Sequence, residues 1–178
     1  NIHVFAYYIN SADNVTADQE SRKLGTETEY ELDKNAFQKI TSQLGEPDID
    51  LFAFRKHSKC RRYFSWKPDP DSEVVNAFTI PWIDINFYAF PPFSLILRVL
   101  RKIQREEATG IVVIPHWPTQ PWFPVFCELL VSDTVFLPPS KILLCSVDRK
   151  PHPLYKHLSL VAGVLSGKVC GDKMYQPK

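Results

Sequence analysis

Apolar residues recur along this chain at two spacings, which predict a mixture of helices and strands. Residues 34–44 carry Phe37, Ile40 and Leu44 on one helical face, and Gly45 is expected to end that helix. Residues 94–107 repeat the helical spacing with a longer apolar stripe. Residues 110–115 are almost continuously apolar, which is typical of a strand covered on both faces.

The remaining elements complete an alternating order. We expect strands at 2–9, 49–53, 83–90, 131–137 and 142–146, the last two forming a hairpin, and helices at 14–22, 120–130 and 154–165. From residue 34 to 146 this alternation predicts an α/β sandwich with a mostly parallel sheet. Ligands bind at the carboxyl ends of the strands in such sheets. The loops at 50–53, 90–93 and 115–117 are therefore expected to converge on one rim.

Composition narrows the class of protein. A hydrophobic content of 44% and a formal net charge of +1 predict a soluble globular protein, and no run reaches the roughly 18 apolar residues of a membrane span. The four cysteines lack zinc-ligand spacing, so we expect free, buried thiols and a reduced intracellular location, cytoplasmic or nuclear. The first residues fall within an expected strand, which predicts a piece of a longer polypeptide.

Charge is distributed unevenly along the chain. Residues 11–50 carry ten acidic and four basic side chains, whereas residues 55–67 are strongly basic. This basic segment interleaves aromatic residues with cations, a pattern that suits stacking on bases and neutralising phosphates. A solvated loop with buried aromatic rings is the alternative. The candidate nucleic-acid contacts in it are Arg55, Lys56, Lys59, Arg61 and Arg62. On the helix at 94–107, we expect Arg98, Arg101, Lys102 and Arg105 to form one outward stripe.

The segment Tyr88-Ala89-Phe90-Pro91-Pro92-Phe93 stands where a strand is expected to give way to a helix. A double proline followed by an aromatic residue suggests a rigid wall for a planar ring, or else a kinked strand end packed in a core. DNA amino-methyltransferases place Asp/Asn-Pro-Pro-Tyr/Phe at such a junction, where the polar residue and a prolyl carbonyl hold the amine of a flipped base. Phe90 occupies the polar position here.

Further segments extend this resemblance. Residues 48–53, 59–64, 90–93 and 112–115 resemble phage-type Dam N6-adenine methyltransferases in order and character. Over roughly residues 1–168 the chain more closely resembles the polyprotein of DIRS-type tyrosine-recombinase retrotransposons, just after reverse transcriptase. The segments that carry this second likeness are 50–53, 62–70, 88–96, 117–124 and 152–154.

The resemblance implies a division of the chain. Residues 1–22 would be the C-terminal remnant of an RNase H domain, followed by a linker at 23–33. Residues 34–147 would be a Dam-like, Rossmann-like methyltransferase-type three-layer sandwich, and 148–178 a C-terminal helix and linker toward a recombinase domain. Asp18 would be the last of four carboxylates that bind two Mg²⁺ ions, and the other three are absent, so this chain cannot cleave RNA. A solvated helix acid is the alternative for Asp18.

The resemblance also implies roles for individual residues. Phe90, Pro91, Pro92 and Phe93 would be a degenerate catalytic motif. Asp50, Phe52 and Ala53 would lie at a site for S-adenosylmethionine, although the Gly-rich loop of many methyltransferases is absent. Trp117 and Trp122 would line the groove for nucleic acid, the alternative being rings that pack the sheet edge.

Three functions follow as hypotheses. The first is a nucleic-acid-associated, catalytically degenerate methyltransferase-like module that holds DNA or RNA within the polyprotein. The second is an active adenine methyltransferase that uses S-adenosylmethionine. The third is a structural spacer between reverse transcriptase/RNase H upstream and tyrosine recombinase downstream.

Overall fold

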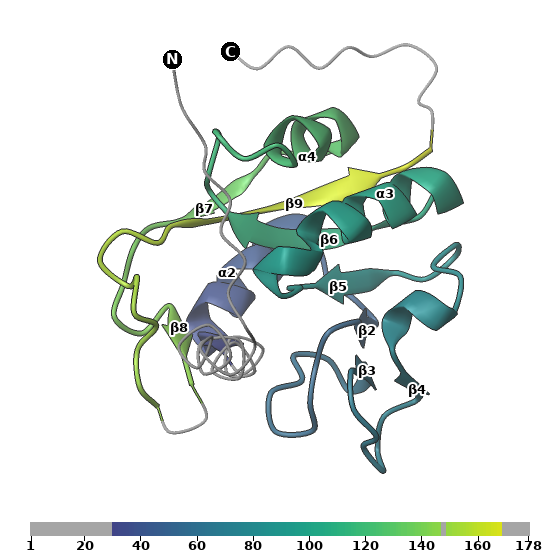
Figure 1. Cartoon of the computed structure of the whole chain (residues 1–178), viewed down its shortest axis with the longest axis horizontal. Coiled ribbons are helices and arrows are strands. Elements are labelled where there is room, and N and C mark those ends of the chain that lie inside the picture. Colours follow the sequence, from purple (N-terminus) through teal and green to yellow (C-terminus); the bar gives the residue numbers. More distant parts are fainter. Residues whose placement is uncertain (1–29, 147–148, 169–178) are drawn as a thin grey trace, which may run out of the picture.

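The computed structural model of the chain describes residues 30–146 and 149–168 (Figure 1). The expected strand at 2–9, the helix at 14–22 and Asp18 lie outside these residues, as does the predicted RNase H remnant. Three α-helices are described: α2 (Lys34–Leu44), α3 (Ile96–Glu106) and α4 (Phe123–Leu129). The strands are β1 (Glu31–Leu32), β2 (Ile49–Asp50), β3 (Arg62–Ser65), β4 (Val74–Val75), β5 (Phe87–Ala89), β6 (Thr109–Pro115), β7 (Val135–Leu137), β8 (Leu144–Cys145) and β9 (Leu160–Ser166).

Seven of these strands form one sheet in the order β4-β3-β2-β5-β6-β9-β7. Neighbours from β4 to β6 are parallel, and β9 runs antiparallel to both β6 and β7. Only β9 is therefore reversed among the seven, which confirms an α/β fold with a mostly parallel sheet. Helices flank this sheet (Figure 1). Within the described residues no helix has both the length and the apolar character that a membrane span requires.

The strand β9 corrects the prediction of a helix at 154–165. It pairs with β6 over seven residues, from Thr109 opposite Ser166 to Pro115 opposite Leu160. Its sequence, Leu-Val-Ala-Gly-Val-Leu-Ser, is continuously apolar up to the final Ser and includes two valines, so it suits a strand buried on both faces. A short apolar run of this kind cannot be distinguished from a buried helix by periodicity. The segment predicted as a C-terminal helix thus supplies an inner strand of the sheet.

The expected hairpin of residues 131–137 and 142–146 is also wrong. The strand β7 covers only 135–137 and pairs with β9, whereas β8 pairs with β1 in a separate two-stranded antiparallel sheet. Residues 31–32, predicted to be linker, therefore form a strand, and Leu32 is buried.

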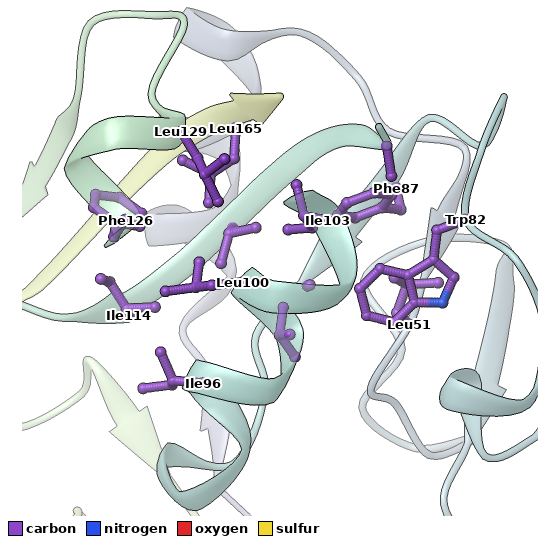
Figure 2. Packing of buried hydrophobic residues seen from close by; sticks show 14 of the residues in the cluster. Leu51, Trp82, Phe87, Ile96, Leu100, Ile103, Ile114, Phe126, Leu129 and Leu165 are labelled. Carbon is purple, nitrogen blue, oxygen red and sulfur yellow. The ribbon is translucent and has the colours of Figure 1, made fainter. Parts of the chain in front are cut away.

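Alternation along the strands divides the core into two faces. Phe87, Ala89, Val112 and Ile114 point to one face, where α3 and α4 pack. Ile96, Leu100 and Ile103 of α3 belong to this first face, and Figure 2 shows Ile103 beside Phe87. Their intervening neighbours Tyr88, Ile111 and Val113 point to the other face, where Ile40 of α2 is buried. Both faces are thus covered.

The helix ends follow from local sequence. Asp33 caps α2 by accepting hydrogen bonds from the backbone N–H groups of Asn35 and Ala36. Gly45, at a φ of 97°, ends it where predicted.

The cationic stripe expected on α3 is only partly correct. Arg98, Arg101 and Arg105 are exposed, but Lys102 is 5% exposed. Its Nζ lies 2.5 Å from Oε1 of Glu106 and 5.2 Å from the ring centroid of Trp82. A lysine stem can cover apolar surface while its ammonium finds a carboxylate and an aromatic face, and this explains the inward position.

Close packing at Gly110 gives a test of the fold. A Cβ at this position would lie 2.5 Å from the ring of the fully buried Phe87. We expect Gly110→Ala to lower the free energy of unfolding by roughly 1–3 kcal/mol, the usual cost of overpacking. Urea unfolding followed by circular dichroism measures it, with Gln104→Ala on the exposed side of α3 as the control. Equal stability of the two variants would contradict the close β5–β6 packing.

Candidate functional site

A pocket of about 250 Å³ opens at the carboxyl ends of β2 and β5. One wall is formed by Phe52 and Ala53, which follow β2, and another by residues 90–95, which follow β5. The small β1–β8 sheet supplies Glu31 and Leu144 to a third side. The pocket therefore lies at the edge of a parallel sheet where ligands generally bind.

The pairing of β2 with β5 explains this meeting of distant segments. The two strands are parallel, with Ile49 opposite Phe87 and Asp50 opposite Tyr88. The chain therefore leaves both strands at the same edge, which brings all of the predicted cofactor and motif residues to one pocket. A T-shaped contact of Phe93 with Trp117, at 5.3 Å between ring centroids, adds the loop after β6. Two of the three loops expected to converge thus line the pocket, and the third contacts one of them through Trp117.

The double proline forms a stiff wall. Proline fixes its own φ and lacks a backbone N–H, so this wall offers no donor from residues 91 and 92. The carbonyl of Pro92 accepts a hydrogen bond of 2.8 Å from the backbone N–H of Leu95, at the entry to α3. Phe90 lines the pocket beside Phe93, with their ring centroids 6.4 Å apart. The side chains of this wall are therefore aromatic or apolar up to Ser94.

Asp50 places an acid in the floor of the pocket. Its side chain is 3% exposed, and its two carboxylate oxygens accept hydrogen bonds from the backbone N–H groups of Phe52 (3.2 Å) and Lys59 (3.1 Å). Burial raises the pKa of Asp50 to about 6, although both hydrogen bonds act to lower it. No salt bridge joins Asp50 to a cation among the described residues.

Two basic side chains of the pocket lining, Lys59 and His57, form ion pairs with Glu31 and not with Asp50. Nζ of Lys59 lies 2.6 Å from Oε1 of Glu31, and Nδ1 of His57 lies 2.8 Å from Oε2. Partial burial acts to raise the pKa of Glu31, but the hydrogen bonds from Lys59 and His57 outweigh it, and the net shift is downward. Lys59, predicted to contact nucleic acid, thus belongs to the pocket lining.

Tyr88 provides a polar group without a partner. It lies beside Asp50 on the neighbouring strand, 1% exposed, and its ring contacts Phe37 of α2 at 5.0 Å between centroids. Its hydroxyl has no hydrogen-bond partner among the described residues, and burial raises its pKa well above the ordinary value. Buried hydroxyls are normally paired, so this one is a candidate ligand contact.

Sequence reasoning missed several of these residues. Glu31 fell in the expected linker, and His57 carried no motif. Tyr88 could have been found, because a parallel register between the strands that hold Asp50 and Tyr88 directs both side chains to one face.

The predicted basic surface divides into paired and unpaired cations. Arg62 makes a two-point contact with Glu73 (2.7 and 2.9 Å), and Nε of Arg55 lies 2.7 Å from a carboxylate oxygen of Asp71. Lys56 and Arg61 are exposed and have no ion pair within residues 30–146 and 149–168. The exposed cationic surface is therefore smaller than the sequence suggested.

The tryptophans take different positions. Trp122 is 8% exposed and packs in the core, and Trp117 is half-buried against Phe93. Trp66, which follows β3, lines the pocket while remaining 45% exposed. The aromatic ring most open to a planar ligand is therefore Trp66 rather than either predicted tryptophan.

The prediction of buried thiols is wrong. Cys127 is exposed, and Cys60 and Cys145 are half-buried, all three as free thiols. Cys170 lies outside the described residues. No group of three or more His, Cys, Asp or Glu side chains within the described part of the chain is arranged to hold a metal ion.

Comparison with known proteins does not extend this picture. No protein-family model matches the chain, and no curated protein matches it.

Asp50 should make stability depend on pH. Its pKa rises from 3.8 to about 6 on folding, so the folded state binds the proton more tightly. The associated stability is fully present below about pH 4 and is lost as pH rises through 6. Between pH 4.5 and 6.5 we expect the chain to lose about 2 kcal/mol of unfolding free energy relative to Asp50→Asn. Urea titrations at both pH values measure it, and parallel pH profiles for the two proteins would contradict the burial of this carboxyl.

Proposed function

We propose that this chain is a methyltransferase-like module of a DIRS-type retrotransposon polyprotein, which holds nucleic acid without methylating it. The observation that carries the proposal is the pocket at the ends of β2 and β5, where Phe90 stands at the double proline. The partners in the polyprotein, reverse transcriptase/RNase H upstream and tyrosine recombinase downstream, rest on the sequence resemblance alone.

The strand order supports the methyltransferase-like part. When the seven strands of the main sheet are renumbered 1 to 7 along the chain, from β2 as 1 to β9 as 7, they lie in the order 3-2-1-4-5-7-6. Strand 7, which is β9, runs antiparallel to the others. This is the dinucleotide-binding order 3-2-1-4-5-6 with one antiparallel strand inserted before the final position. The same arrangement is typical of S-adenosylmethionine-dependent methyltransferases, which the sequence resembles.

The chemistry of the double-proline wall supports the absence of methyl transfer. Transfer to an adenine amine requires acceptors for its two hydrogens, and the Phe90 side chain offers none. Asn86 precedes β5, at its other end, and its Nδ2 donates to the carbonyl of Glu46 at 2.9 Å. An amine left half-paired in this pocket would cost roughly 1–3 kcal/mol. The pocket volume also falls below the range of roughly 300–1,000 Å³ that drug-sized ligands occupy.

Contact with nucleic acid is supported by exposed groups of the basic segment. Lys56 and Arg61 are exposed cations of this segment, and Trp66, five residues after Arg61, presents an exposed aromatic ring that lines the pocket. Such a combination suits a single strand, since cations attract phosphates and aromatic rings stack on bases.

An active methyltransferase is the second candidate, and one observation favours it. The buried carboxyl of Asp50 at the end of β2 forms no salt bridge with a cation of the described residues, and a ligand with a positive charge, such as S-adenosylmethionine, would provide one. Isothermal titration with S-adenosylmethionine tests this cofactor directly.

Methyl transfer separates these two candidates. We expect no transfer of labelled methyl groups from S-adenosylmethionine to adenine-containing DNA, because Phe90 cannot accept a hydrogen bond. Phe90→Asn restores an acceptor and should raise the binding of an adenine-containing strand about tenfold if the flipped base lies at this wall. Methylation by the unmodified chain would establish the second candidate instead.

Salt dependence tests the contact with nucleic acid. We expect binding of a labelled single-stranded oligonucleotide to weaken with salt, and Lys56→Ala/Arg61→Ala to reduce the log–log slope by about 1.4, roughly 0.7 for each lost phosphate contact. Fluorescence anisotropy at several salt concentrations measures both. Arg101→Ala/Arg105→Ala on α3 removes the same charge elsewhere and should leave the slope unchanged. Equal slopes for the chain and both variants would contradict phosphate contacts by Lys56 and Arg61.

A further inference from the structure

The double-proline wall offers an unusual combination of groups to a ligand. The carbonyl of Pro91 accepts no hydrogen bond from the described residues, whereas that of Pro92 is occupied by the Leu95 N–H. The side chains around it are the rings of Phe90 and Phe93 and the two prolines. The wall therefore contains a backbone carbonyl that has no partner among the described residues, next to an aromatic, apolar surface.

This combination discriminates between two forms of an amine on a planar ring. An unmodified amine has two N–H donors, so one would pair with the carbonyl while the other would lose water and face the Phe90 ring. A singly methylated amine has one N–H and one methyl group. Its N–H can pair with the carbonyl, and its methyl group can contact the ring without leaving a donor unpaired.

The rest of the pocket suits a flat, nitrogen-containing ring. Trp66 lines the mouth, exposed enough for stacking, and Phe52 adds an aromatic ring from the other wall. The buried Tyr88 hydroxyl has no partner among the described residues, although buried polar groups normally have one. A volume of about 250 Å³ is sufficient for one nucleobase rather than a large cofactor.

We infer that this pocket binds N6-methyladenine, presented by a single strand of nucleic acid, in preference to adenine. The inference rests on the proposed function, because it assigns the ligand of the same site. In this account, Phe90, which stands where the methyltransferase motif has Asp or Asn, makes the pocket selective for the methylated base. The base must come from a single strand or be flipped, since the pocket encloses it away from a base stack. The same base occurs in DNA and RNA strands, and matched oligonucleotides of each kind distinguish the two sources.

Matched oligonucleotides test the inference on the full chain. Four labelled single strands of one sequence, DNA and RNA, each with a central adenine or N6-methyladenine, are titrated by fluorescence anisotropy. We expect roughly tenfold tighter binding of the methylated strand in at least one of the two series, which also identifies the source. Phe90→Asn supplies a second acceptor and should abolish the preference, whereas Phe90→Leu keeps the surface apolar and should retain it.

The control variant and the alternative outcomes separate the two proposals. Phe136→Asn changes a phenylalanine that is 47% exposed on the edge strand β7, and it should leave the preference unchanged. Equal binding of methylated and unmethylated strands would overturn the inference while leaving the proposed function intact. A preference that survives Phe90→Asn would also overturn it. Failure to bind any of the four strands would overturn the proposed function as well.

Discussion

The parallel pairing of β2 with β5 is the constraint on which the site depends. β2 is two residues long and β5 is three, yet their register places Asp50 beside Tyr88. Because the strands are parallel, the segments that follow them begin at the same edge of the sheet. The backbone N–H of Leu51 then bonds to the carbonyl of Tyr88 at 2.9 Å, which extends the pairing to the start of the pocket. A slip of β2 by one residue would turn Asp50 to the opposite face and into the apolar cluster around Trp82, away from Tyr88.

Enclosure of this edge gives the pocket its chemistry. The β1–β8 sheet brings Glu31 across the opening, where it pairs with Lys59 and His57. Among the described residues, Asp50 accepts hydrogen bonds from backbone N–H groups, and the apolar wall of Phe90 and Phe93 adds no charge. A buried acid, an unpaired hydroxyl and an aromatic wall thus coexist in one small volume. These are the groups on which the proposal of a base-binding site rests.

Much of the fold could be predicted from the sequence where periodicity and caps agree. The bounds of α2 follow from Asp33, Gly45 and the spacing of Phe37 and Ile40, and β6 follows from its continuous apolar run. The strand β9 could not be predicted, because the apolar run of residues 160–165 suits a helix and a buried strand equally. Only the presence of β6 and β7 on either side decides between them.

The sequence was sufficient to predict which strand ends form the site, but not which side chains form ion pairs around it. Asp50 and the Phe90 segment lie at the carboxyl ends of expected strands, so their meeting follows from the sheet rule alone. Ion pairs depend on distant residues, and no local pattern shows that Arg62 pairs with Glu73 or that Lys59 turns inward to Glu31. The basic segment therefore seemed more exposed from the sequence than it is.

The most direct measurement is a two-dimensional ¹H–¹⁵N spectrum of the labelled chain during titration with a short single strand that contains one N6-methyladenine. The account predicts shifts concentrated on the backbone amides of Phe52, Lys59 and Leu95, all held at the pocket by hydrogen bonds. The amides of Arg101 and Arg105, on the exposed side of α3, should not move. Shifts confined to α3, or no shifts at saturating strand, would contradict a base-binding site at the ends of β2 and β5.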